Sequence, residues 1–223
     1  MPFAESLVYL FDQQIAEAGW LVVNKVALVT RHRAQHVLEK VQEWYPDKRI
    51  LLQDSRENTG VRDWLEGATS GPKYIGTVTA DLDCPAYGAA EAELAWLNQR
   101  ITIISDTEPI GRRVEEWIAR ILAGLSGAGA TIGHLKFSIT ASGKTTKVSL
   151  TTVVDPAWRH SLNTLQGFGV DILVNARVVI EAPELQRIIS DATSAVVGAT
   201  SPNESPDTFH PAFPEPTHRI LSP

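Results

Sequence analysis

An asparagine and a lysine, Asn24 and Lys25, stand side by side directly after the apolar run 20–23. In the pattern Asn-Lys-x-Asp, the asparagine amide meets a guanine ring, the lysine stem covers the face of the ring, and the aspartate accepts two N–H groups of its edge. Here Ala27 holds the place of that aspartate, and each donor left unpaired costs about 1–3 kcal/mol. We interpret the motif as a degenerate base-binding turn; the alternative is a strand that ends in a polar turn.

A second motif imitates a phosphate-binding loop. Residues 142–145 read Ser-Gly-Lys-Thr, which matches the end of G-x-x-x-x-G-K-[ST]. Five residues before Gly143, however, stands Ser138 where that loop requires glycine. The motif also lies between two alternating segments, whereas a phosphate loop leads into a helix. We therefore predict a hairpin turn here and reject a phosphate site.

The metal-ligating and nucleophilic residue types do not form a convincing site. His32 and His36 lie four residues apart on a predicted helix and could share a face, but no third ligand is near. Cys84 is a single thiol and cannot form a zinc site by itself. No nucleophile–base pair has a recognisable spacing. Five further candidates are expected to be structural, solvated or helix-capping: His134, His210, His218, Asp81 and Asp83.

Composition and charge limit the class of protein. The chain has 223 residues and a formal net charge of −6, so we expect neither nucleic acid nor an anionic membrane as a partner. The one cysteine rules out an internal disulfide and favours a reducing compartment. No cationic segment followed by an apolar core opens the chain, and no apolar run approaches the roughly 20 residues that cross a bilayer. We expect a cytoplasmic protein.

The first part of the chain predicts alternating helices and strands. We expect helices over 2–18 and 30–44, with strands within the runs 20–29 and 48–53, a loop over 66–76 and a helix over 89–98. This order favours an α/β sheet with parallel strands. Two parallel strands are too few to stand alone because both edges stay unpaired. Either another chain completes the sheet, or the sequence begins partway through a domain.

The second part predicts a small α+β unit. We expect strands at 101–105 and 171–180, helices over 109–125 and 183–192, and a hairpin over 131–154 that turns at 141–143. The stretch after residue 198 is rich in proline and predicts an irregular tail. The predicted fold class is therefore α/β, with a partial parallel-sheet nucleotide-domain remnant followed by a small α+β domain. The predicted boundaries are 1–98, 99–198 and a tail at 199–223.

Several segments, in order, resemble the CobW-type GTPases. SLVYLFDQQIAEAGWLVVNKVALV is similar to the family's helix ending QIEEAD that runs into LIVLNKIDLL. LLQDSRENTGVRDWLE takes the place of the second base loop, with Asp54-Ser55-Arg56 where Ser-Ala-Lys is usual. AYGAAEAELAWLN is similar to YAEAEALLGWLN. GHLKFSIT, the hairpin after it, DILVNARVVIEAPELQRII and PTHRI resemble the C-terminal domain. The resemblance covers nearly the whole chain.

The resemblance implies a function for intact relatives, and it shows which motifs of that function are missing from this sequence. Intact members look like GTP-driven chaperones for metal ions or metal-containing cofactors, using GTP, Mg²⁺ and a transition metal such as zinc or cobalt. It assigns guanine binding, in degenerate form, to Asn24, Lys25, Asp54 and Ser55. The family's phosphate loop, Walker-B acid and Cys-x-Cys-Cys metal motif have no counterpart here. We therefore expect no catalytic residue, no metal site, no cofactor and no GTP binding or hydrolysis by this chain alone.

A second hypothesis belongs to a different class. The chain is then a non-catalytic interaction module whose sheet is completed by a partner chain or by self-association, and nucleotide plays no part. The absent carboxylate at Ala27 favours this hypothesis. Under either hypothesis the partner is a protein, and under the first a metalloprotein client is also implied. Mixing with a partner that carries a phosphate loop separates the two, because only a split GTPase gains nucleotide binding.

Overall fold

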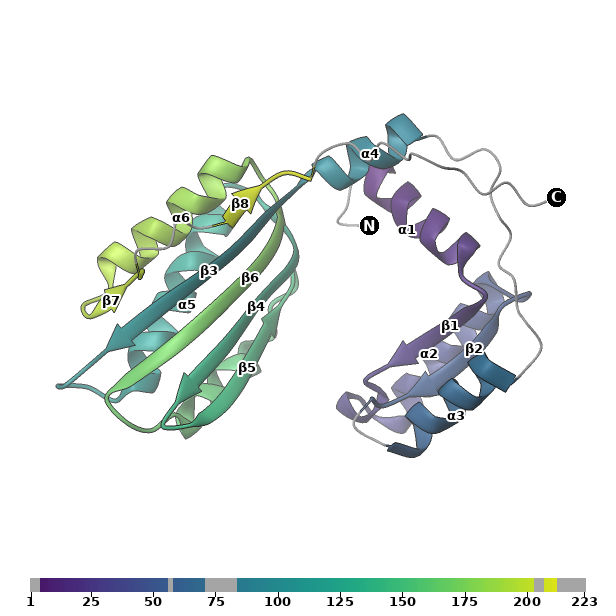
Figure 1. The fold of residues 1–223 in the computed structure, drawn as a ribbon, viewed down its shortest axis with the longest axis horizontal. Coiled ribbons are helices and arrows are strands. Elements are labelled where there is room, and N and C mark those ends of the chain that lie inside the picture. The colour runs from purple at the N-terminus through teal and green to yellow at the C-terminus, as the bar shows by residue number, and fades with distance from the viewer. Residues whose placement is uncertain (1–4, 56–57, 71–83, 203–206, 212–223) are drawn as a thin grey trace. The chain divides into compact units, whose positions relative to one another are not determined.

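The computed structural model describes residues 5–55, 58–70, 84–202 and 207–211, and these fall into two compact units. The N-terminal unit holds residues 8–55 and 58–70; the C-terminal unit holds residues 5–7, 84–202 and 207–211. Helices and strands alternate in the first unit and build a layered α+β structure in the second, so the mixed α/β fold class is confirmed (Figure 1). The predicted boundary after residue 98 is wrong, because it falls inside a strand and the units divide between residues 83 and 84.

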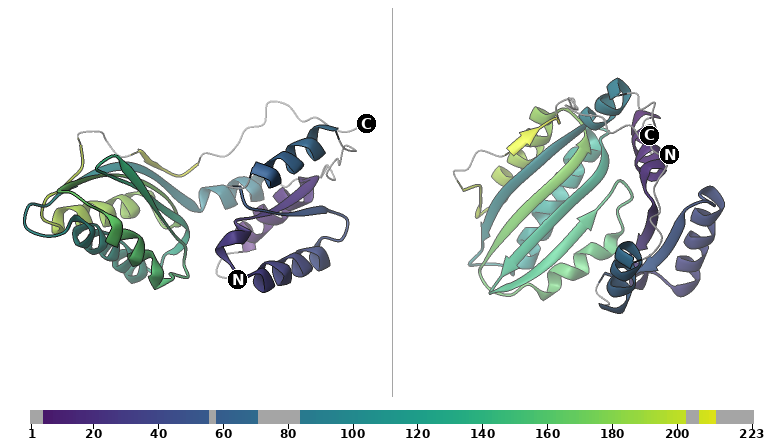
Figure 2. Two further views of the ribbon diagram at one scale, coloured as in Figure 1. Left: turned by 90° about the horizontal axis from the view of Figure 1, so that it is seen from below. Right: turned by 45° about the vertical axis from the view of Figure 1, so that its right-hand side comes forward.

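The N-terminal unit is built on a parallel pair of strands. Helix α1 (Glu5–Glu17) leads into β1 (Trp20–Asn24), the short 3-10 helix η1 (Val26–Leu28), α2 (Arg31–Trp44), β2 (Arg49–Gln53) and α3 (Asn58–Ser70). The two strands run parallel, from Trp20 beside Arg49 to Asn24 beside Gln53. Helices α2 and α3 lie on opposite faces of the pair (Figure 2). The second strand and the second helix are confirmed, and the first strand is confirmed as far as Asn24, after which η1 replaces the rest of the predicted run.

Local capping explains where the second helix begins. The Thr30 side chain accepts a hydrogen bond from the Arg33 amide at 3.3 Å, as its N-cap position predicts. The loop predicted over 66–76 is wrong in its first part, because α3 continues to Ser70. The Trp20 ring lies against α3 at Gly67, and only glycine leaves room for it, because a Cβ at Gly67 would lie 2.2 Å from the ring. The remainder of that predicted loop lies outside the described residues.

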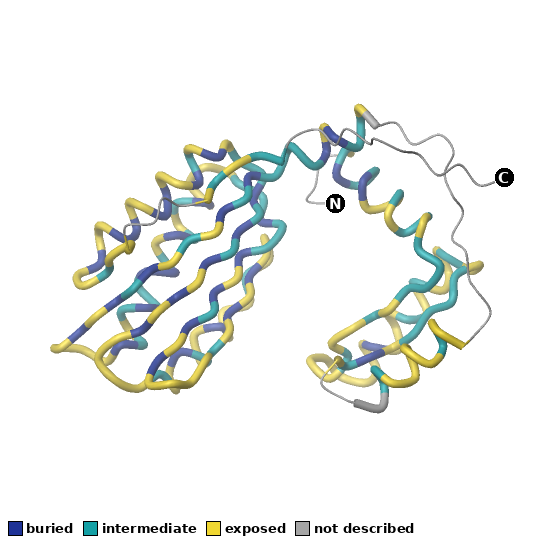
Figure 3. Tube along the Cα trace, viewed as in Figure 1, coloured by how far each residue is buried: buried dark blue, intermediate teal, exposed yellow. Residues whose placement is uncertain are grey.

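The N-terminal unit buries very little apolar surface. Among its described residues, Leu10 and Ala34 are the only buried apolar side chains. Exposed residues predominate on α2 and α3, and most strand residues are only half-buried (Figure 3). Its exposed large apolar side chains are Phe11, Val22, Leu28, Val29, Val37, Trp44, Leu52, Trp64 and Leu65. An α/β layer with helices on both faces normally buries its strands, so this unit has the form of such a layer without its core.

The C-terminal unit is an antiparallel sheet covered by helices on one face (Figures 1 and 2). Its elements are α4 (Cys84–Ala92), β3 (Leu94–Ile104), α5 (Ile110–Gly127), β4 (Thr131–Ala141), β5 (Lys144–Leu150), the 3-10 helix η2 (Pro156–Thr164), β6 (Gly169–Val179), α6 (Ala182–Ala195), β7 (Ala199–Thr200) and β8 (Asp207–Phe209). The strand order is β5-β4-β6-β3-β7, and β8 also pairs with β3. The layered architecture expected for this region is confirmed.

Two expectations about this unit are wrong. The helix predicted over 89–98 ends at Ala92, and β3 takes over from Leu94. Ala95 and Leu97 are buried while their neighbours are not, which is the alternation of a strand and overrides the helix-favouring composition. The tail predicted to be irregular supplies β7 and β8. Three residues of β8 pair with β3, and Phe209 packs on Trp96 with ring centroids 5.7 Å apart.

The core of the C-terminal unit joins the sheet to α5 and α6. Trp117 of α5 is fully buried, meets the Phe137 ring edge-on at 5.6 Å and donates its indole N–H to Thr193 Oγ1 at 3.1 Å. The bond satisfies a polar group that would otherwise destabilise the core. Gly124 lets α5 approach α6 closely, because a Cβ there would lie 2.8 Å from Ile188.

The predicted hairpin is confirmed. Strands β4 and β5 pair from Leu135 beside Leu150 to Ala141 beside Lys144. Ser142 and Gly143 form the turn with φ values of 47° and 76°, the combination that a two-residue hairpin of the favoured twist requires. The imitation of a phosphate loop is therefore a tight turn between two strands.

Candidate functional site

The predicted base-binding residues lie at the carboxyl ends of the two parallel strands. Asn24 ends β1 and Gln53 ends β2, directly beside it in register. The Asn24 Nδ2 amide donates to Ser55 Oγ at 2.6 Å, and the Ser55 backbone N–H donates to Asn24 Oδ1 at 3.0 Å. The structure thus brings together the two loops that the sequence placed far apart, and Asn24 is the residue that joins them.

The same asparagine also shapes the turn that follows it. Its Oδ1 accepts a second hydrogen bond, from the Lys25 backbone N–H at 2.7 Å. Lys25 adopts a left-handed conformation with φ 66° and ψ 31°, which non-glycine residues rarely adopt. The side-chain oxygen of Asn24 therefore accepts hydrogen bonds from two backbone N–H groups. One of the two hydrogens on its Nδ2 is left for a ligand.

Gln53 is a site residue that the sequence analysis missed. It is only 9% exposed, and its Nε2 lies 3.4 Å from Ser55 Oγ. Its Oε1 is buried and has no hydrogen-bond partner among the described residues. A glutamine directly after the apolar run Ile-Leu-Leu was the available signal, since a polar residue that ends a buried strand points at the edge where parallel sheets bind ligands.

The arrangement fits guanine only in part. Ala27 lies exposed in η1 and offers no acceptor for the two N–H groups of a guanine edge. Asp54 follows Gln53 and is half-buried, but it belongs to the other loop. What the site offers is an amide donor, a lysine and a serine, which suit a planar polar group without selecting guanine. The Gly-Lys-Thr sequence lies at the β4–β5 turn and forms no phosphate loop.

Two histidines of the C-terminal unit, His134 and His210, form hydrogen bonds within it. His134 Nε2 lies 2.5 Å from Asn175 Oδ1, and burial lowers the pKa of the imidazole although that hydrogen bond opposes the shift; Lys136 and Arg177 lower it further. His210 Nδ1 lies 2.5 Å from the Ala92 carbonyl, and its Nε2 accepts from the Ala182 amide at 3.2 Å. His210 therefore links α4, α6 and the tail.

No metal centre forms in the described part of the chain: no three His, Cys, Asp or Glu side chains gather there. His32 and His36 are exposed on α2. Asp81, Asp83, His218 and the side chain of Cys84 lie outside the described residues.

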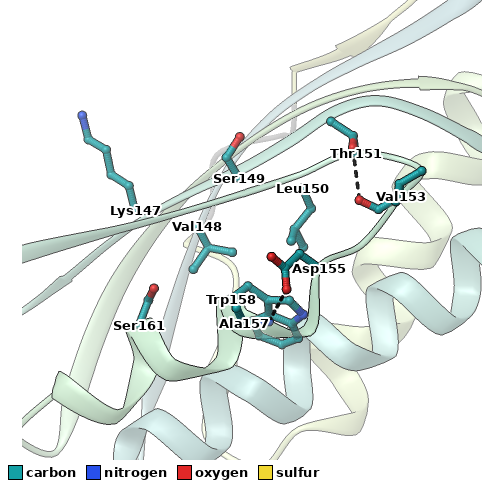
Figure 4. Close-up of a pocket in the computed structure, with 10 residues that line it drawn as sticks. All are labelled: Lys147, Val148, Ser149, Leu150, Thr151, Val153, Asp155, Ala157, Trp158 and Ser161. Carbon is teal, nitrogen blue, oxygen red and sulfur yellow. Dashed lines mark hydrogen bonds between the residues drawn. The ribbon is translucent and has the colours of Figure 1, made fainter. Parts of the chain in front are cut away.

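A hollow of about 310 Å³ opens between β5 and η2. Val148, Leu150 and Trp158 form its apolar floor, with Lys147 and Ser161 at its rim (Figure 4). Asp155 accepts a hydrogen bond from the Ala157 amide at 2.8 Å, so its carboxylate caps η2. The hollow brings together no nucleophile and base.

Comparison with known proteins identifies no relative. No family model matches the chain, nor does any curated protein or solved structure. In the ranges that the structure describes, every helix is too short or too polar to cross a lipid bilayer.

Proposed function

We propose that the N-terminal unit is a section of a nucleotide-binding α/β domain of the CobW type, and that strands from another segment complete its sheet. One observation carries the proposal: the unit has the layers of such a domain but buries only two apolar side chains among its described residues. The missing strands come from the same polypeptide or from a separate chain.

The strand pair itself supports completion from outside. In the described residues, β1 pairs only with β2 and β2 only with β1. Val22 and Leu52, on the two strands, are each 37% exposed. Parallel strands are normally covered on both faces and flanked by further strands. A strand added beside the pair would satisfy its edge backbone groups, and the layers that pack on a wider sheet would extend over these side chains.

Within the completed domain, this chain supplies the base-side loops. Asn24 and Ser55 hold the two loops together, Lys25 offers a cation, and Asp54 stands in the second loop. Phosphate and Mg²⁺ binding belong to the completing segment. The CobW resemblance implies GTP as the nucleotide, zinc or cobalt as the cargo and a metalloprotein as the client. Ala27 in place of the guanine-selecting carboxylate predicts weak discrimination between GTP and ATP.

The alternative is a non-catalytic interaction module. It is favoured by Ala27 and by the two backbone donors that already occupy Asn24 Oδ1. In that case a partner strand completes the sheet and no nucleotide binds.

The experiment is co-expression with a segment that carries a phosphate loop, a Walker-B acid and a Cys-x-Cys-Cys motif from a CobW-type GTPase. Co-purification is measured first, and binding of fluorescent GTP and ATP second. The control segment has the phosphate-loop lysine replaced by alanine. Co-purification with nucleotide binding that needs this lysine supports the GTPase proposal. Co-purification without nucleotide binding supports the interaction module, and a chain that stays alone refutes completion by such a segment.

A further inference from the structure

The face of the antiparallel sheet opposite α5 and α6 carries an ordered array of side chains. Successive residues of a strand alternate between the two faces, so the register places the outward residues in rows across the sheet. One row contains Asn98, Asn175, Lys136 and Ser149. The next row contains Arg100, Leu173, Ser138 and Lys147. This alternation appears along the strands as buried and exposed positions (Figure 3).

Three cations lie near an exposed apolar side chain on this face. Leu173 is 50% exposed; Arg100 lies beside it on β3, Lys136 lies one row away on β4, and Lys147 lies in the same row on β5, one strand further out. All three cations are exposed, and none forms an ion pair within the described part of the chain. Strands lie about 4.8 Å apart, so Arg100 and Lys147 stand about 14 Å apart across three spacings.

Two carboxylates border the three-cation cluster. Asp171 lies in the next row, on the same strand as Leu173, and accepts a hydrogen bond from Thr102 at 2.9 Å. Asp207 lies on β8, at the edge of the sheet beside Asn98. Three cations against these two carboxylates leave the face positive in a chain whose net charge is −6. A positive patch of this kind complements an acidic surface and steers its approach.

A fourth cation and a histidine lie in the row next to the cluster. The Arg177 guanidinium lies 3.7 Å above the Trp96 ring, between the strand positions of Trp96 and His134. The pKa of His134 is lowered chiefly by burial, and the positive charges of Lys136 and Arg177 lower it further. The imidazole thus experiences the same positive field that an acidic ligand would meet.

We propose that this face binds an acidic segment of a partner polypeptide, with its carboxylates on Arg100, Lys136 and Lys147 and an apolar side chain on Leu173. Leu173 at the centre favours a polypeptide, since a uniformly charged polyanion has no side chain to place there. Single-stranded nucleic acid would need exposed rings on which its bases stack. Here Trp96 already packs against Arg177 and Phe209, and Phe209, 38% exposed, stands at the edge of the face on β8, away from Lys136 and Lys147. The inference concerns the C-terminal unit alone and does not depend on the proposed function.

The test uses the full chain and a fluorescein-labelled nine-residue peptide with a central leucine flanked by glutamates. Fluorescence anisotropy measures its dissociation constant, and a peptide with glutamine in place of glutamate serves as the neutral probe. Replacing Arg100→Gln, Lys136→Gln and Lys147→Gln together should weaken binding of the acidic peptide by about tenfold, because each exposed ion pair contributes about twofold to fivefold. Binding to the wild-type chain should also weaken as salt rises.

The matched control carries Arg31→Gln, Arg33→Gln and Arg62→Gln, which remove the same charge from exposed positions of the N-terminal unit. This control should bind like the wild type, and circular dichroism checks that both triple variants are folded. The proposal is overturned if the acidic peptide binds no better than the neutral one, or if both triple variants lose the same affinity. Tighter binding of an oligothymidylate of equal charge would overturn it in favour of nucleic acid.

Discussion

The two units should unfold in separate steps, because their cores differ so greatly. Phe137 is 1% exposed and packs against Trp117, at the centre of the C-terminal core. Phe137→Ala removes most of this buried ring, and such truncations cost about 3–5 kcal/mol. The C-terminal unit should unfold second, at the higher urea concentration. If its free energy of unfolding falls by about 2 kcal/mol per molar urea, the midpoint of this second transition should fall by about 2 M in the variant. The first transition, which belongs to the N-terminal unit, should stay in place.

The assay is urea unfolding followed by tryptophan fluorescence and far-ultraviolet circular dichroism. Trp20, Trp44 and Trp64 report on the N-terminal unit, and the other three tryptophans on the C-terminal unit. Phe168→Ala is the matched control, since Phe168 is 72% exposed and its truncation should move the midpoint by no more than about 0.3 M. A single transition that shifts as a whole in Phe137→Ala would refute the division into a sparse and a dense core.

Three further predictions concern single side chains. Asn24→Ala removes three hydrogen bonds at the ends of β1 and β2 and should lower the stability of the first urea transition by about 1–2 kcal/mol, whereas the second transition should not respond. His210→Ala should lower the second transition by about 1–2 kcal/mol and speed hydrogen exchange at the Ala182 amide; unchanged exchange would contradict the role of His210 as a link. Because the folded pKa of His134 is lowered, the unfolded chain binds more protons, so the second transition should weaken as pH falls below about 6.5. Urea midpoints at pH 7.5 and 5.5 check this, and the difference should shrink in His134→Gln but not in His160→Gln.

Strong periodic patterns made most of the fold predictable. The hairpin strands, of eleven and seven residues, and the 18-residue amphipathic helix α5 each keep one period along their length, and all were placed correctly. The errors cluster where local preference and tertiary pairing disagree. Residues 89–98 are rich in alanine, leucine and glutamate, which favour a helix, yet from Leu94 onward they lie beside β6 and form a strand.

The short strands β7 and β8 carried no readable signal. Each has two or three residues, and each exists only because the edge of β3 offers backbone partners. Such pairing depends on a strand about one hundred positions earlier, which no local window contains. A proline-rich stretch therefore reads as irregular although part of it completes a sheet.

At the candidate site, the sequence predicted which residues lie close together but not the hydrogen bonds and backbone conformations that they adopt. Strand order alone implied that the turns after β1 and β2 share an edge, and Asn24 and Ser55 do meet there. The left-handed backbone of Lys25 and the burial of Gln53 are features of the folded turns, and the hydrogen bonds that join those turns run between Asn24 and Ser55. These contacts leave no trace in the spacing of residues along the chain.

The link at His210 has a consequence for synthesis on the ribosome. The imidazole joins the tail to the Ala92 carbonyl, 118 positions earlier, and to the start of α6. The strand β3 emerges before its sheet partners, and among the described residues its outer edge pairs with β7 and β8, which are made about one hundred residues later. The nascent C-terminal unit thus keeps an open strand edge until residue 210 has left the exit tunnel, well after the other strands of its sheet have been made.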